Sequence, residues 1–228
     1  MVGPHWSIIP HESLTMSAQI KERPILFSGA MVRALIDGTK TQTRRAITMP
    51  ASWDCIVYAD YGDGWWPYRS DDGESPNYDN NEIPMRCPYG QPGDRLWVRE
   101  TWAQPAALDP GPTVYRADYP ACVPAGFTNL PKADEITWKP SIHMFRKDSR
   151  ILLEVVSVRV ERLQDIGDRD SRAEGVTIED RHMGGYCAGQ FLPPAVRAYR
   201  ELWEQINGAG SWDANPWVWV VEFKRVMQ

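Results

Sequence analysis

The sequence predicts an α+β fold built around a small curved sheet or barrel, with a few short helices and two long irregular insertions. Several short apolar or alternating segments are typical of strands, and only three segments have helical spacing. Two long stretches rich in Pro, Gly and aromatic residues show neither period. We expect a flexible N-terminal extension over residues 1–20 and a single domain over 21–228, with insertions at about 46–92 and 104–140.

The first strand and helix are marked by the residues at their ends. Residues 24–27 form a short apolar run that predicts a buried strand. Ser28 can cap a helix whose apolar residues recur at i, i+3 and i+4 through Ile36, and Gly38 ends that helix. The polar segment 39–45 that follows is expected to be a loop.

The later elements are expected as strands over 95–100, 151–160 and 217–223 and as helices over 168–173 and 193–206. The turn signal Pro92-Gly93-Asp94 precedes the first of these strands. The first and last strands of such folds often pair, and this pairing would bring the segment around Lys40 close to the C-terminal strand.

The composition limits the classes of function. The chain has 228 residues, of which 43% are hydrophobic and 24% charged, which is typical of a globular protein. We expect a cytoplasmic protein without a membrane contact, because no apolar run is long enough to span a bilayer and the start does not resemble a signal peptide. A net charge of −5 argues against coating duplex nucleic acid by charge alone, although it allows a pocket with a basic rim. The four cysteines form no CxxC pair, so we expect neither a metal nor a cofactor.

One short motif carries most of the functional information. The pattern Gly38-x-Lys40-x-x-Thr43-x-Arg45 follows the first predicted helix. Here the chain resembles the ASCH domain family of the PUA-like superfamily, which is marked by GxKxxTxR after its first helix. The resemblance covers about residues 21–226 and is greatest to the phage and prophage branch. The further matching segments are 92–94, 139–144, 173–175, 211–217 and 221–223.

The resemblance implies a fold and a chemistry. It implies a PUA-like small β-barrel with nucleoside or single-stranded RNA partners. One member of the family hydrolyses N4-acetylcytidine with a Lys and a Thr of this motif and a Glu after the second helix. These positions correspond to Lys40, Thr43 and Glu174. Another member cuts RNA, so activity differs within the family.

The residue types suit amide hydrolysis, which needs a nucleophile, a proton acceptor and stabilisation of an oxyanion. A partly buried lysine can take the proton of a threonine hydroxyl because desolvation lowers the lysine pKa. We therefore assign Thr43 as nucleophile, Lys40 as base and Glu174 as the orienting or proton-relay group. A lysine that only binds phosphate would show the same sequence pattern.

Further candidates for substrate contact are Arg45, Glu100, Trp102, His143 and Trp217. The family pattern turns Arg45 inward and leaves Arg44 on the surface. Tryptophans can stack on a nucleobase, and the two chosen here adjoin irregular segments at the expected pocket mouth. Core packing for the tryptophans, an arginine partner for Glu100 and a structural hydrogen bond for His143 are the alternatives.

Three functions follow from these candidates. The first is a hydrolase of a modified cytidine, such as N4-acetylcytidine. The second is a non-catalytic module that binds RNA or a modified base. The third is a ribonuclease with Lys40 and His143 as base and acid; the negative net charge favours small substrates and places it last.

Overall fold

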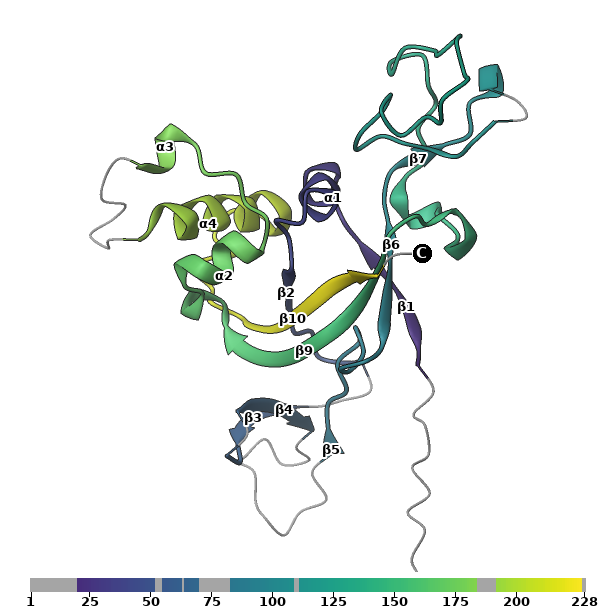
Figure 1. Ribbon diagram of the computed structural model, residues 1–228. Coiled ribbons are helices and arrows are strands. Elements are labelled where there is room, and N and C mark those ends of the chain that lie inside the picture. Colours follow the sequence, from purple (N-terminus) through teal and green to yellow (C-terminus); the bar gives the residue numbers. More distant parts are fainter. Residues whose placement is uncertain are drawn as a thin grey trace, which may run out of the picture.

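The computed structural model describes residues 20–51, 55–62, 64–69, 83–108, 111–183 and 192–226. Residues 1–19 of the expected N-terminal extension lie outside this part. The strands are β1 (Glu22–Leu26), β2 (Gln42–Ala46), β3 (Ile56–Asp60), β4 (Trp65–Arg69), β5 (Ile83–Pro84), β6 (Arg95–Arg99), β7 (Trp102–Ala103), β8 (Val114–Tyr115), β9 (Leu152–Arg162) and β10 (Trp217–Val226). The helices are α1 (Gly29–Ile36), α2 (Asp168–Ala173), α3 (Asp180–Met183) and α4 (Pro194–Asn207), and short 3₁₀ turns include η2 (Ser141–His143) and η3 (Arg146–Asp148) (Figure 1).

The protein is an α+β fold with a five-stranded main sheet in the order β1-β6-β9-β10-β2. β1 pairs with β6 in parallel, and the other three pairings are antiparallel. The prediction of a closed barrel is wrong for the described residues, because β1 and β2 remain the two edges of an open sheet. The two edge strands are connected by a side chain instead of by backbone hydrogen bonds. Arg45 Nη2 of β2 donates to the Leu26 carbonyl of β1 at 2.7 Å.

The main sheet carries a hydrophobic core on each face. Along β10, Trp219 and Val221 enter a core with Val32 and Leu35 of α1. Alternate residues of a strand point to opposite faces, so Val218 and Val220 enter the second core instead. α4 covers this second core with Val196, Tyr199 and Trp203, and Leu163, Ile166 and Trp212 complete it. Trp217 packs against the same core as Trp219.

Two predictions about strand pairing need correction. β1 pairs with β6 rather than with the last strand. The segment 39–45 is not wholly a loop, because β2 begins at Gln42 and pairs with β10 from Ala46↔Val218 to Gln42↔Glu222. The expected proximity of the Lys40 segment to the C-terminal strand is therefore confirmed, although β2 rather than β1 provides it.

The two insertions lie at opposite ends of the molecule in Figure 1. The first, residues 46–92, was expected to be irregular, but its described part contains the small antiparallel sheet β3-β4-β5. An aromatic contact attaches this small sheet to the main sheet. Trp66 of β4 packs edge-on against Trp219 of β10, with ring centroids 5.0 Å apart. The second, residues 104–140, contains β8, which pairs with β7. Its Leu108, Val114 and Ile136 form a small core with Ala103 of β7.

The expected helix ends are close to the observed ones. The Ser28 hydroxyl accepts a hydrogen bond from the Met31 N–H at 3.4 Å, as an N-cap residue does. α2 spans the predicted residues, and α4 is displaced by one residue at each end. None of the helices in the described ranges is long and apolar enough to cross a membrane.

Candidate active site

Lys40 lies in the turn that follows α1, and this turn packs against the C-terminal end of α2. The N–H groups of Thr39 and Lys40 both donate to the Ala34 carbonyl, at 2.9 and 3.0 Å. Lys40 forms an antiparallel bridge with Glu174, and the Thr41 N–H donates to the Ala173 carbonyl at 2.8 Å. The segments marked by the sequence motifs around residues 40 and 174 therefore lie directly against each other.

The Lys40 ammonium is fully buried and has three acceptors. Nζ donates to the carbonyls of Gln42 and Glu174, both at 2.8 Å, and to Glu174 Oε2 at 3.0 Å. The exposed fraction of the side chain is 0% for Lys40 and 3% for Glu174. Burial lowers the pKa of Lys40, and the Glu174 carboxylate opposes that shift.

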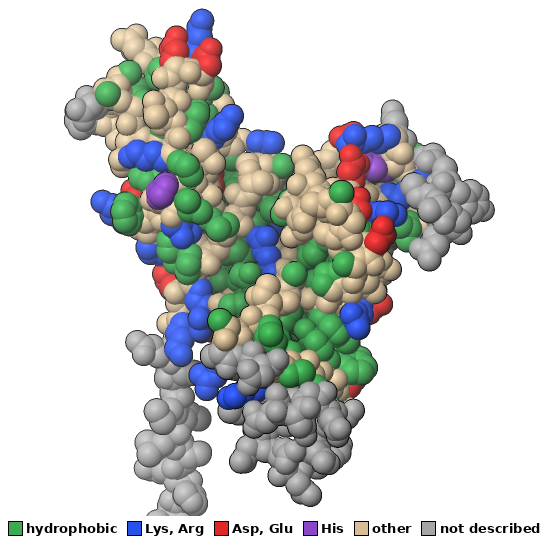
Figure 2. All heavy atoms as spheres, turned by 180° about the vertical axis from the view of Figure 1, so that it is seen from behind, with side chains coloured by type: hydrophobic (Ala, Val, Ile, Leu, Met, Phe, Trp, Pro, Cys, Tyr) green, Lys and Arg blue, Asp and Glu red, His purple; other side chains and the backbone are tan. Residues whose placement is uncertain are grey.

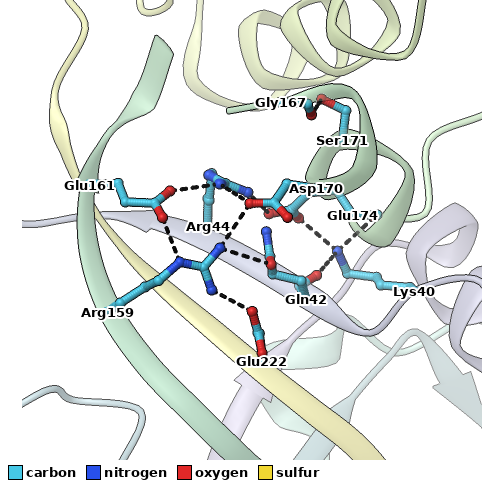
Figure 3. A network of polar contacts seen from close by, with 10 residues as sticks. All are labelled: Lys40, Gln42, Arg44, Arg159, Glu161, Gly167, Asp170, Ser171, Glu174 and Glu222. Atoms are coloured by element: carbon cyan, nitrogen blue, oxygen red, sulfur yellow. Dashed lines mark hydrogen bonds and ion pairs between the residues drawn. The ribbon is translucent and has the colours of Figure 1, made fainter. Parts of the chain in front are cut away.

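Arg44 extends this pair into a larger network of charges (Figure 3). Its guanidinium donates to Glu161 at 2.8 Å, to Asp170 at 3.0 Å and to Glu174 Oε1 at 3.5 Å. Arg159 of β9 shares two of these carboxylates, and it also contacts Glu222 and Gln42. The prediction that Arg44 lies on the surface is wrong, because its side chain is 0% exposed.

The network favours the ionised form of Asp170. Burial by itself would raise the pKa of Asp170, but hydrogen bonds and charges from Arg44 and Arg159 hold that pKa below its usual value. Asp170 and Glu174 are four residues apart and thus share one side of α2 and its C-terminal end. The carboxylates reach β2 from this side.

Thr43 lies next to this network on the wall of a small cavity. The cavity has a volume of about 40 Å³, and its wall includes Met31, Thr43, Arg45, Glu174, Tyr199 and Asn207. Among the described residues no hydrogen bond joins the Thr43 hydroxyl to Lys40 Nζ, whose three protons are donated elsewhere. We call this space the Lys40 cavity, because Glu174, the ion-pair partner of Lys40, lines its wall.

Arg45 links the two edges of the open sheet and also lines the Lys40 cavity. Besides its hydrogen bond to Leu26, its guanidinium lies 5.5 Å from the centre of the Phe27 ring. Lys40 Nζ lies 5.4 Å from the centre of the same ring. Two cations of the motif therefore contact the same aromatic ring.

Two of the predicted substrate-binding residues, Trp217 and Glu100, are engaged in contacts away from the Lys40 cavity. Trp217 stacks on Tyr58 at 4.6 Å, and the Arg162 guanidinium lies 4.4 Å from its ring centre. Glu100 is 2% exposed and accepts two hydrogen bonds from Arg150, each at 3.0 Å. Burial raises the pKa of Glu100, and Arg150 opposes the shift.

The remaining two predicted residues, Trp102 and His143, lie together in a cleft of about 340 Å³. Arg99, Lys139 and Phe145 also line this cleft, which we call the Arg99 cleft. Trp102 was expected at a pocket mouth but is only 3% exposed, beneath Lys139, whose Nζ lies 4.6 Å from the ring centre. Neither residue contributes to the Lys40 cavity.

Sequence reasoning found Glu174 but missed the inward position of Arg44 and the roles of Arg159, Glu161 and Asp170 in the network. The signal was an alternation, because Gln42 and Arg44 share one side of β2 and turn toward the same network. Reading 39–45 as a loop concealed that alternation. For metals, the described residues contain no group of three or more His, Cys, Asp or Glu that could hold an ion, and Cys187 lies outside them.

A scan of the sequence against protein-family models found no match, and searches of curated proteins and of solved structures found none either. The possible chemistry of the site therefore follows from its own residues.

Proposed function

We propose that this protein is an ASCH-type, PUA-like domain that hydrolyses an N4-acylated cytidine at Lys40, Thr43 and Glu174. The observation that carries the proposal is the buried Lys40–Glu174 ion pair beside a cavity whose wall includes Thr43. Taking an ammonium and a carboxylate out of water costs several kcal/mol per ion. Buried titratable pairs of this kind cluster at functional sites, because catalysis needs shifted pKa values.

The chemistry begins with a proton transfer inside the pair. Lys40 Nζ passes a proton to Glu174 Oε2, 3.0 Å away, which leaves a neutral amine and a carboxylic acid. Burial favours this neutral pair, since it lowers the pKa of Lys40. The amine then accepts the Thr43 hydroxyl proton while Oγ1 bonds to the acyl carbon.

The second half of the reaction restores the enzyme. When the tetrahedral intermediate collapses, the bond between the acyl carbon and N4 breaks, and N4 takes a proton from the Lys40 ammonium. Water then cleaves the Thr43 ester and releases the carboxylic acid. Arg45 supplies positive charge at the cavity wall, where the oxyanion would develop.

Substrate entry requires a movement of α4. A cavity of about 40 Å³ holds roughly one water molecule and not a nucleobase. Asn207 at the end of α4 contributes to the cavity wall, and the neighbouring Ile206 is 48% exposed. The proposal therefore assigns the observed structure to a closed state, which the C-terminal turn of α4 opens.

The test is incubation of the purified protein with N4-acetylcytidine, followed by chromatography. Thr43→Val keeps the shape of the buried side chain but removes the nucleophile, so we expect the rate of cytidine release to fall by at least about 100-fold. Thr43→Ser keeps a hydroxyl and should retain measurable turnover. The proposal would be contradicted if the wild-type protein left N4-acetylcytidine unhydrolysed, or if Thr43→Val released cytidine at the wild-type rate.

A second candidate function, a non-catalytic module for single-stranded RNA, is favoured by the Arg99 cleft. This cleft combines cations from Arg99 and Lys139 with an aromatic ring, Phe145, that is 65% exposed. Positive charge beside an exposed ring suits a phosphate and its stacked base. Binding of a labelled RNA without turnover would favour this function over hydrolysis.

The ribonuclease hypothesis gains no support from the described contacts. His143 lines the Arg99 cleft, to which Lys40 does not contribute. A general base and acid must reach the same phosphodiester, so this pair is not the basis of our proposal.

A further inference from the structure

A second and larger cavity lies between β1 and the first insertion. Its volume is about 470 Å³, and Lys21, Arg23, Trp66, Met85, Arg86 and Val158 are among the residues that line it. We call it the Arg23 cavity. Figure 2 shows Lys and Arg side chains gathered between the lower end of β1 and the first insertion. The Arg23 cavity shares no lining residue with the Lys40 cavity or the Arg99 cleft.

The position of Arg23 is unusual for a strand residue. Arg23 and Ile25 share one side of β1, and Ile25 is 2% exposed in the hydrophobic core. The pairing partner of Arg23 on β6 is the fully buried Leu96. A cation therefore stands on the core-facing side of an edge strand, and its Nε is inaccessible to solvent and has no acceptor in the described structure.

In the described part of the chain, the Arg23 cavity is lined by three cations, Lys21, Arg23 and Arg86, and by one carboxylate. No ion pair joins Lys21, Arg23 or Arg86 to a carboxylate within the described ranges. The carboxylate that lines the cavity, Asp94, already accepts from two backbone N–H groups, those of Lys21 at 3.0 Å and Gln91 at 3.2 Å. Unpaired cations that converge on a cavity attract anions, even in a chain with a net charge of −5.

The other ionisable groups near the cavity are neutral. Burial raises the pKa of the Cys87 thiol to about 11. Burial also raises the pKa of the Tyr89 hydroxyl. At neutral pH neither group supplies a negative charge that would balance the three cations.

Another part of the wall is apolar and aromatic. Trp66 is held in place by a hydrogen bond from its Nε1 to the Met85 carbonyl at 2.9 Å and by its edge-on contact with Trp219. Met85 and Val158 complete this side. A cavity of about 470 Å³ falls in the size range of small-molecule sites.

We propose that the Arg23 cavity binds a phosphate ester that carries a flat ring, such as a nucleoside monophosphate. The phosphate lies among Lys21, Arg23 and Arg86, and the ring lies against Trp66. The bound group is either a free nucleotide or the 5′-phosphorylated end of an oligonucleotide, which share this chemistry. The site is separate from the Lys40 cavity and does not depend on hydrolysis there.

The experiment is titration calorimetry with cytidine 5′-monophosphate, cytidine and inorganic phosphate at low ionic strength. We expect the monophosphate to bind more tightly than either fragment. Arg23→Gln and Arg86→Gln should each weaken its binding by about tenfold, as the loss of one charge-assisted contact does. Lys132→Gln and Arg225→Gln, which remove exposed cations away from the cavity, are the matched controls and should leave the affinity unchanged.

Two further measurements separate the possible outcomes. Thr43→Val should bind the monophosphate as the wild type does, so a failure of the hydrolase proposal leaves this one intact. A 5′-phosphorylated oligonucleotide that binds more tightly than its 5′-hydroxyl counterpart would identify the oligonucleotide end as a ligand. No binding of the monophosphate, or equal affinities for Arg23→Gln, Arg86→Gln and the controls, would overturn the proposal.

Discussion

Gly175 lies where the end of α2 comes closest to the Lys40 segment, and Gly175→Ala tests whether this contact shapes the site. A Cβ atom at Gly175 would lie 2.8 Å from both Ala34 Cβ and Lys40 Cβ. The backbone has φ +76°, a left-handed conformation that side chains disfavour. Gly38 provides the matched control, because its φ is +75° and no atom lies within 4 Å of a Cβ built there.

The two variants separate backbone strain from crowding. Alanine in the left-handed region costs roughly 1–2 kcal/mol, and this cost applies at both positions. Overpacking a filled site costs about 1–3 kcal/mol more, and this cost applies only at Gly175. The restriction that alanine imposes on the unfolded chain is the same in both variants and cancels in the comparison. We therefore expect Gly175→Ala to lose about 1–3 kcal/mol more free energy of unfolding than Gly38→Ala.

Urea unfolding at pH 7, followed by circular dichroism, measures both losses. Because the clash involves Lys40 Cβ, Gly175→Ala should also displace the Lys40–Glu174 pair and lower any activity of the site, whereas Gly38→Ala should affect stability alone. Equal losses of stability in the two variants would refute the reasoning, since they would show that the α2 end does not press against Lys40.

Two further predictions concern buried titratable groups. Lys40→Met leaves the Glu174 carboxylate buried without its ammonium partner, so urea unfolding should show a loss of about 3–5 kcal/mol. The double variant Lys40→Met/Glu174→Gln should regain part of this loss. If the double variant loses the full sum of the two single losses, the two side chains are not coupled. Burial raises the pKa of the Cys87 thiol to about 11 in the folded protein. Above about pH 8.5 the thiol therefore loses its proton in the unfolded chain while it stays protonated in the folded one, and the free energy of unfolding should fall by roughly 3 kcal/mol up to pH 11. Cys87→Ala should show a shallower decline of the urea midpoint over this range, and parallel declines would contradict the assigned burial.

The sequence predicts best the elements with local signals. Ser28 and Gly38 mark the ends of α1 because capping and left-handed backbone depend on single residue types. The predicted strand over 151–160 corresponds to β9, since its β-branched residues favour a strand wherever it pairs. The predicted strand over 217–223 likewise corresponds to β10, whose alternate residues enter the two cores.

The elements that escaped prediction depend on distant partners. β2 has the sequence Gln-Thr-Arg-Arg-Ala, which indicates a strand only when β10 is beside it and carboxylates from β9 and α2 receive Arg44. β3 and β4 are stabilised by aromatic contacts with Trp217 and Trp219, which lie some 150 residues later in the chain. Arg44 and Arg45 point to opposite sides of β2 because of the pleat, which a loop would not have.

The charges of the molecule divide into two arrangements with different expected responses to salt. In the buried part of the network, Lys40 and Arg44, whose side chains are 0% exposed, each contact at least one carboxylate directly. Such pairs are weakly screened because solvent ions cannot enter between them. In the Arg23 cavity the cations face open space instead, so an anion bound there would be screened strongly. Raising the salt concentration from 20 to about 200 mM should therefore weaken nucleotide binding at the Arg23 cavity while leaving the network around Lys40 intact.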